Sequence, residues 1–148
     1  MTASARGKIP RRLGNLAERE PKALAEIEVR DNGKLFAGMY GRTRYQPEWW
    51  CYDAGLADKV EGARIPIDKP ETFAFTRHEP VGAVGALTAW NSPLLFAAEK
   101  CAAALAAFCA AVVKPSEFAS ASTLEFAHLA QEAGLPDGMV DVVTGFSG

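Results

Sequence analysis

The chain has 148 residues, of which 49% are hydrophobic and 23% are charged, and its net charge is -2. This length predicts one domain with a sizeable buried core, and the composition excludes a disordered chain. The low net charge argues against nucleic acid or an anionic membrane as a partner. Residues 1–45 hold ten Lys/Arg against five Asp/Glu. Acidic residues are interleaved with these bases, which favours a solvated helical face: Glu18, Glu26 and Glu28.

The three cysteines, Cys51, Cys101 and Cys109, are odd in number and show no CxxC spacing. They indicate neither a disulfide framework nor a zinc site, and a reducing cytoplasm is the expected location. His78 and His128 lack metal-ligand spacing, so no metal is predicted. The most apolar run, "CAAALAAFCAAVV", is too short to span a bilayer of about 30 Å. The N-terminal "MTASARGKIPRRLG" lacks the apolar core of a secretory signal and weakly resembles a transit peptide, but the start of a helix is favoured.

Apolar residues at helical spacing open the chain and predict helices around Leu13, Leu16, Leu24 and Ile27. Pro21 suits the first position of the second helix, and Asn32-Gly33 supplies its end. A further helix is predicted from about Pro47 to Val60, again with a proline in the first turn. Residues 62–70 are expected to form a loop or an edge strand.

The hydrophobic period changes after Thr72. "VGAVGALTAW" is a continuous apolar run of strand length, which is typical of a parallel strand covered on both faces. It is followed by a helix at Pro93–Ala107, the strand "AAVVK", a helix at Ser122–Ala133 and the strand "MVDVV". This β-α-β-α-β order predicts an α/β fold with a right-handed, doubly wound, Rossmann-like parallel sheet. Residues 1–70 are then N-terminal helices and a loop, and residues 71–148 are the sheet half.

Polar residues follow two of these strands, at Thr88–Asn91 and at Lys114–Glu117, the latter reading "KPSE". Ligands in open α/β sheets bind outside the carboxyl ends of the strands, where these clusters are expected to lie close together. A helix N-cap or turn role for Asn91 and an ordinary loop for "KPSE" are the alternatives. "GAVGAL" is not GxGxxG, and Ser92-Pro93 is not a glycine-rich phosphate cradle, so no dinucleotide motif decides the matter.

Three segments in order, "EPVGAVGALTAWNSPL", "VVKPSE" and "EAGLPDGMVDVVTG", resemble the aldehyde dehydrogenase superfamily, with Lys114 twenty-three residues after Asn91. The resemblance extends upstream through "RRLGNLAERE", "EIEVRDNGK" and "CYDAGLADKVEG", and so covers nearly the whole chain. It implies an NAD(P)-dependent oxidation of an aldehyde to a carboxylic acid. In that reaction a cysteine thiolate attacks the aldehyde, hydride leaves to nicotinamide, and a glutamate-activated water releases the acid.

The resemblance also implies roles for particular residues. Asn91 would be the catalytic oxyanion donor, pointing its side-chain amide at the substrate oxygen that becomes negative. Lys114 and Glu117 would hold the adenosine ribose hydroxyls, with Ser116 nearby. The backbone of Leu87, Thr88, Ala89 and Trp90 would line the cofactor cleft. A carboxylate at Glu117 repels a 2′-phosphate, which favours NAD, with NADP as the alternative.

The family's cysteine nucleophile and glutamate base are expected downstream of a segment like "VVTGFSG", and a β-rich segment is expected upstream of position 1. The resemblance therefore implies a part truncated at both ends, without the catalytic domain and without turnover on its own. None of the three cysteines matches the nucleophile motif. Alternatives are half of a split enzyme, an assembly or regulatory partner of an intact aldehyde dehydrogenase, a homo-oligomer, or a poorly stable relic.

Local departures from the family pattern concern packing. Phe108-Cys109 stands where Gly-Asn or Gly-Cys is usual, and Phe108 is expected to resist the positive φ that glycine permits at a helix end. Pro10 stands where Leu is commoner, and it would cost about 3 kcal/mol inside a helix but little in a first turn. Ala89 stands where proline is commoner.

Overall fold

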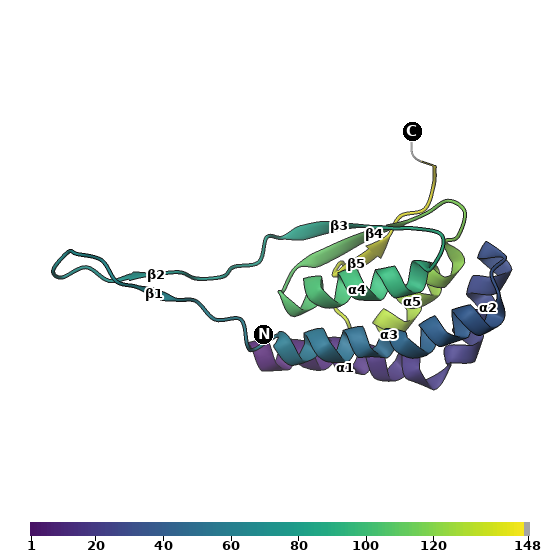
Figure 1. Cartoon of the computed structure of the whole chain (residues 1–148), viewed down its shortest axis with the longest axis horizontal. Coiled ribbons are helices and arrows are strands. Elements are labelled where there is room, and N and C mark those ends of the chain that lie inside the picture. The colour runs from purple at the N-terminus through teal and green to yellow at the C-terminus, as the bar shows by residue number, and fades with distance from the viewer. Residues whose placement is uncertain (147–148) are drawn as a thin grey trace.

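A computed structural model describes residues 1–146 and arranges them in three layers (Figure 1). Three helices come first, α1 (Ala3–Arg19), α2 (Pro21–Asn32) and α3 (Phe36–Leu56). Two short strands follow, β1 (Arg64–Ile65) and β2 (Ala74–Phe75). The rest of the fold is β3 (Ala83–Thr88), α4 (Pro93–Ala106), β4 (Ala110–Pro115), α5 (Ala121–Glu132) and β5 (Val140–Val142).

The main sheet has the strand order β3-β4-β5, and both of its pairings are parallel. This confirms the predicted β-α-β-α-β order and the α/β class. Because strand order follows chain order, crossovers of one hand place α4 and α5 on the same face of the sheet (Figure 1). Ala86 and Val113 are buried on that face, whereas Leu87 and Val112 are exposed on the other. Within residues 1–146 helices thus cover one face of the sheet, whereas the apolar run of residues 81–90 predicted a strand covered on both faces.

The helices α1 and α3 pack side by side in close contact, and two glycines of α1 make this possible. A Cβ on Gly7 would lie 2.5 Å from the carbonyl oxygen of Ala54, and a Cβ on Gly14 would lie 2.8 Å from the Cβ of Trp50. Trp50 is fully buried and stacks on Phe126 of α5, with ring centroids 5.6 Å apart. The α1–α3 pair is therefore a tightly packed base beneath α4 and α5.

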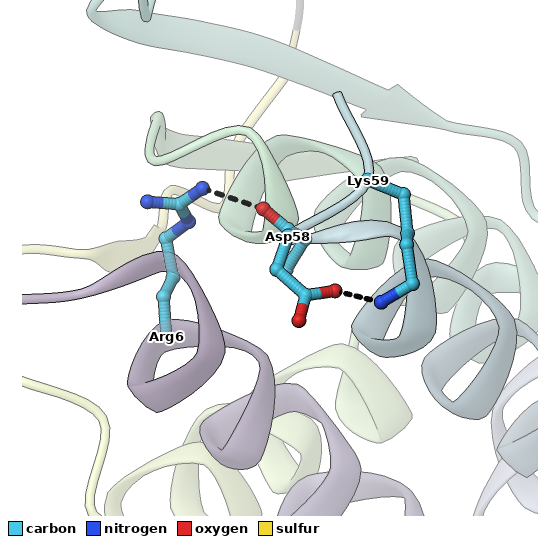
Figure 2. Close-up of polar contacts among 4 residues, drawn as sticks. Arg6, Asp58 and Lys59 are labelled. Carbon is cyan, nitrogen blue, oxygen red and sulfur yellow. Dashed lines mark hydrogen bonds and ion pairs between the residues drawn. The ribbon is translucent and has the colours of Figure 1, made fainter. Parts of the chain in front are cut away.

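Arg6 of α1 links the C-terminal ends of α3 and α4 by hydrogen bonds. Its Nη2 donates to the carbonyl of Ala57 just after α3 (2.9 Å), and its Nε donates to the carbonyl of Ala106 at the end of α4 (2.8 Å). Figure 2 shows the guanidinium directed at the segment after α3, where Asp58 and Lys59 form an exposed ion pair. Both accepting carbonyls belong to helix ends, which have no intrahelical partners of their own.

The third helix is much longer than the sequence indicated, because it begins at Phe36 and not at Pro47. Its buried residues continue at helical spacing through the proline: Met39, Thr43, Gln46, Pro47, Trp50 and Ala54. Pro47 is in the helix interior, as is Pro10 in α1, and both are buried. Each removes one helical hydrogen bond at a cost of about 3 kcal/mol, which the close packing of α1 on α3 offsets.

The strands β1 and β2 form an antiparallel hairpin that projects away from the helices (Figure 1), with Arg64 paired to Phe75. This agrees with the predicted loop or edge strand at residues 62–70. Among the described residues, none of the helices has the length and hydropathy that a membrane span requires.

Phe108 ends α4 in the left-handed conformation, with φ of 64°. The amide of Phe108 bonds the carbonyl of Leu105 (3.1 Å) and that of Cys109 bonds the carbonyl of Ala104 (2.8 Å), which is a Schellman motif. Phe108 thus adopts the positive φ that it was expected to resist, and the Cβ leaves a backbone strain at this position. The Arg6 guanidinium lies over its ring, 5.4 Å from the centroid, and this contact helps to offset the strain.

The backbone strain at Phe108 can be measured by comparing two substitutions. Phe108→Gly and Phe108→Ala both remove the ring, but only glycine removes the Cβ that disfavours positive φ. We expect the glycine variant to be more stable than the alanine variant by about 1 kcal/mol in chemical denaturation. Ala107→Gly, at a φ of -80°, is the control and should lower stability. Equal stability of the two Phe108 variants would contradict the strain.

Native thiol reactivity is expected to separate Cys51 from the other two cysteines. Cys101 is fully buried, and burial raises its pKa to about 12, while Cys109 is 3% exposed and Cys51 is half-buried on α3. Because the thiolate is the reactive species, alkylation under native conditions should modify Cys51 first and leave Cys101 intact. Peptide mass spectrometry checks this, and Cys51→Ser should abolish the fast phase. Modification of Cys101 at the rate of Cys51 would contradict the burial.

Candidate functional site at the carboxyl ends of β3 and β4

The two polar clusters lie side by side, as the sequence predicted. In the parallel register Leu87 is opposite Lys114 and Thr88 is opposite Pro115. The amide of Ser116 continues the ladder by donating to the carbonyl of Thr88 (3.0 Å). Leu87, 73% exposed, and Lys114 share the uncovered face of the sheet. The carboxyl ends of two adjacent strands therefore present one continuous polar and apolar surface.

Residues after β4 are held by short-range hydrogen bonds. Lys114 is half-buried, and its Nζ donates to the carbonyl of Pro115 (2.8 Å). The Ser116 hydroxyl accepts from the amide of Phe118 (3.3 Å), which makes a tight turn. Glu117 is exposed. An ammonium donor and a carboxylate acceptor thus stand three residues apart at the end of one strand.

Asn91 lies in the turn between β3 and α4. Ser92 is the N-cap residue of α4, so the alternative in which Asn91 caps the helix is wrong, whereas its turn position is as expected. The carbonyl of Asn91 accepts from the Arg42 Nη1 (2.8 Å). Among residues 1–146 the side-chain amide of Asn91 makes no hydrogen bond, and the residue is partly exposed. Its N–H groups are available to a ligand.

The turn that carries Asn91 is held by the α2–α3 region. Arg42 of α3 also donates to the hydroxyl of Ser92, and Asn32 contacts the carbonyl of Trp90 through its Nδ2 (3.5 Å). The Lys34 Nζ is 5.4 Å from the centroid of the Trp90 ring. Sequence reasoning missed Arg42, because its partners are 49 and 50 residues away and no local pattern identifies them.

Glu28 of α2 is fully buried, and its Oε1 accepts from the amide of Leu94 at the start of α4 (2.9 Å) and from the Ser122 hydroxyl of α5 (3.3 Å). The prediction that Glu28 belongs to a solvated face is wrong, although Glu18 is exposed. A usable signal was present, because Glu28 is four residues after Leu24, on the buried face of α2. Asp31 similarly accepts from the amide of Ala121 (2.7 Å).

Burial raises the pKa of the Glu28 carboxyl above its usual value of 4.5. The hydrogen bonds from Leu94 and Ser122 and the positive charge of Arg42 lower it in part, and Asp31 raises it slightly. Its Oε2 is buried without a hydrogen-bond partner in the described structure. Desolvation of the charged form is therefore the dominant influence on this carboxyl.

Glu28 is expected to make stability depend on pH. Its pKa is higher in the folded state, so its contribution is fully present below pH 4.5 and is lost as pH rises through the folded-state pKa. Gln cannot ionise, so Glu28→Gln should gain stability relative to the parent protein as pH rises from 4.5 towards neutrality. Urea denaturation across this range measures the difference, with the exposed Glu18→Gln as control. A difference for Glu28→Gln that stays constant, or falls with pH, would contradict the raised pKa.

Comparisons with known proteins agree with this arrangement. The model of the aldehyde dehydrogenase family matches residues 1–148. A dehydrogenase of Acinetobacter baylyi, named for (Z)-2-((N-methylformamido)methylene)-5-hydroxybutyrolactone, is 48% identical over 99% of this chain and 30% of its own length. Aldehyde dehydrogenase family 2 member C4 of Arabidopsis thaliana is 41% identical over 99% of the chain and 29% of its length.

Solved structures give the same result. An NAD-dependent aldehyde dehydrogenase from Sinorhizobium meliloti superposes with a TM-score of 0.94 at 36% identity, over 99% of this chain and 29% of that one. Betaine aldehyde dehydrogenase from Staphylococcus aureus, in complex with NAD+, has a TM-score of 0.94 at 38% identity, with the same coverage. The chain spans about 30% of the length of the curated relatives it matches. With a family match over its whole length and this fold, the chain belongs to the aldehyde dehydrogenase family.

Proposed function

We propose that the chain is part of an NAD-dependent aldehyde dehydrogenase, in which it supplies cofactor-binding residues and the oxyanion donor. The complete enzyme would oxidise an aldehyde to a carboxylic acid. The observation that carries this proposal is the adjacency of the Asn91 turn and the Lys114–Glu117 segment at the carboxyl ends of two parallel strands. Residues 1–70 would support the site, and residues 71–148 would bind the cofactor.

The residues present fit NAD. The exposed Leu87 side chain and Lys114 share the uncovered face of the sheet, so an apolar contact and a charged donor are presented to a ligand there together. Lys114 can donate to a ribose hydroxyl and Glu117 can accept from one, with Ser116 beside them. The backbone from Leu87 through Ala89 to Trp90 would line the cleft. NAD, when bound, accepts the hydride that the aldehyde carbon releases.

Asn91 would stabilise the negative charge that develops on the substrate oxygen. Its amide is not used by the described part of the protein, while its backbone carbonyl is held by Arg42, so the backbone that carries the donor is fixed before substrate arrives. One such preorganised donor is worth about 2.7–4 kcal/mol of barrier. Glu117 would disfavour the 2′-phosphate of NADP through like-charge repulsion.

The thiolate nucleophile would come from outside these 148 residues. Cys101 and Cys109 are buried in and just after α4, and Cys51 lies on α3. A thiol whose pKa is raised to about 12 by burial, as for Cys101, is a poor nucleophile at neutral pH. The 148-residue polypeptide by itself is therefore expected to bind cofactor without turning over an aldehyde.

Cofactor binding tests the proposal directly. Calorimetric titration with NAD+ should show binding to the chain, and Lys114→Met should weaken it about tenfold, the effect of losing one hydrogen bond to a charged donor. Lys100→Met, at an exposed position on α4, is the matched control and should leave the affinity unchanged. Glu117→Gln should reduce the preference for NAD+ over NADP+.

Two outcomes would contradict the proposal. If Lys114→Met and Lys100→Met change the affinity for NAD+ equally, the assignment of the binding site to Lys114 is contradicted. Failure of the folded chain to bind NAD+ at all would remove cofactor binding as a property of these residues.

A further inference from the structure

We propose that Arg42 is the positioning residue for Asn91. The importance of this for catalysis rests on the proposed function, in which Asn91 is the oxyanion donor. Arg42 projects from the N-terminal third of α3, an element that carries none of the proposed cofactor or oxyanion residues. Its Nη1 donates both to the carbonyl of Asn91 (2.8 Å) and to the hydroxyl of Ser92. It therefore contacts the backbone of the proposed donor and not its amide.

The two contacts together fix the turn. The Ser92 hydroxyl itself donates to the carbonyl of Asn91, so carbonyl, hydroxyl and guanidinium form a closed three-membered network. Ser92 is 2% exposed, which limits competition from water. A guanidinium is planar and always charged, so it holds two acceptors in fixed directions. The peptide plane after Asn91 is thereby fixed, and with it the origin of the side chain.

Contacts from α2 hold the residues on both sides of Asn91, whereas Asn91 itself is bonded by Arg42 and by the neighbouring Ser92 hydroxyl. Asn32 meets the carbonyl of Trp90 at 3.5 Å, the limit of a hydrogen bond, and Glu28 holds the amide of Leu94. Arg42 and the adjacent Ser92 hydroxyl both donate to the Asn91 carbonyl, and Arg42 is the donor that comes from another element of the fold. Loss of Arg42 is expected to increase the backbone motion of Asn91, while Trp90 and Leu94 on either side keep their contacts with α2.

The order of the Asn91 backbone tests this by nuclear magnetic resonance on the 148-residue chain. In the parent protein the ¹⁵N order parameter at Asn91 should be about 0.85, and in Arg42→Met it should fall below about 0.6. The order parameters of β3 and β4 should stay unchanged. Arg44→Met is the matched control, since Arg44 is an exposed arginine of the same helix that lies over Tyr40.

Two further variants keep the proposal falsifiable if Arg42→Met folds poorly. Arg42→Lys retains one charged donor and should give an intermediate order parameter. Ser92→Ala removes the hydroxyl but leaves the bond between Arg42 and the Asn91 carbonyl, so it should loosen Asn91 less than the Arg42 substitutions do. Unchanged order at Asn91 in both Arg42 variants would overturn the proposal, as would a larger effect of Ser92→Ala than of either.

Binding of NAD+ separates this inference from the proposed function. Lys114 and Glu117 lie at and just after the end of β4, and the carbonyl of Trp90 is contacted by Asn32 and not by Arg42. Arg42→Lys, which keeps a charged donor at Asn91, should therefore bind NAD+ with the affinity of the parent protein. A merely structural role for Arg42 would lower affinity and order throughout the sheet, and this result would overturn the positioning role. If the parent protein binds no NAD+, the proposed function fails, while the order parameter at Asn91 still decides whether Arg42 positions it.

Discussion

The hydrogen bond from the amide of Leu94 to the buried carboxylate of Glu28 is the interaction on which the arrangement of the site depends. It satisfies a donor in the first turn of α4 that has no partner inside the helix, in a place that water does not reach. The same carboxylate oxygen accepts from Ser122 of α5, so α2, α4 and α5 meet at one atom. Because α4 begins directly after the Asn91 turn, this atom fixes where the turn ends.

Close packing of α1 on α3 gives that interaction its rigidity. Gly7 and Gly14 allow contacts that no other residue would fit without displacing the backbone of α3. Arg6 then joins the ends of α3 and α4 through two carbonyls. These contacts hold the C-terminal half of α3, and beside Arg42 the Thr43 hydroxyl donates to the carbonyl of Pro21 at the start of α2 (2.8 Å). Arg42 therefore reaches the turn from a helix that is packed on both neighbours. The long helix thus contributes to the site although none of the proposed ligand-binding residues belongs to it.

The sequence predicted the elements whose evidence is local and missed those that depend on distant partners. Continuous apolar runs and helical spacing identified β3, β4, α4 and α5, and the adjacency of Asn91 and Lys114 followed from parallel pairing. The start of α3 was missed because Pro47 suits a first helical turn, and only packing against α1 explains a proline in its interior. The spacing of Glu28 from Leu24 was a local signal of its burial, whereas its partners, 66 and 94 residues away, could not be identified from the sequence.

Two separate parts of the chain support the two halves of the site. The side chains proposed to hold the adenosine ribose lie at and just after the end of β4, and they depend on the ladder between β3 and β4 for their position. The Asn91 turn depends instead on α2 and α3. Asn32 of α2 and Arg42 of α3 contact the turn itself, and Glu28 of α2 accepts from the amide of Leu94 at the start of α4. The two halves meet where the Ser116 amide bonds the carbonyl of Thr88, three residues before Asn91. The ladder that ends in this bond sets the distance between the proposed cofactor-binding segment and the Asn91 turn, whereas the backbone of Asn91 is held from the helical side.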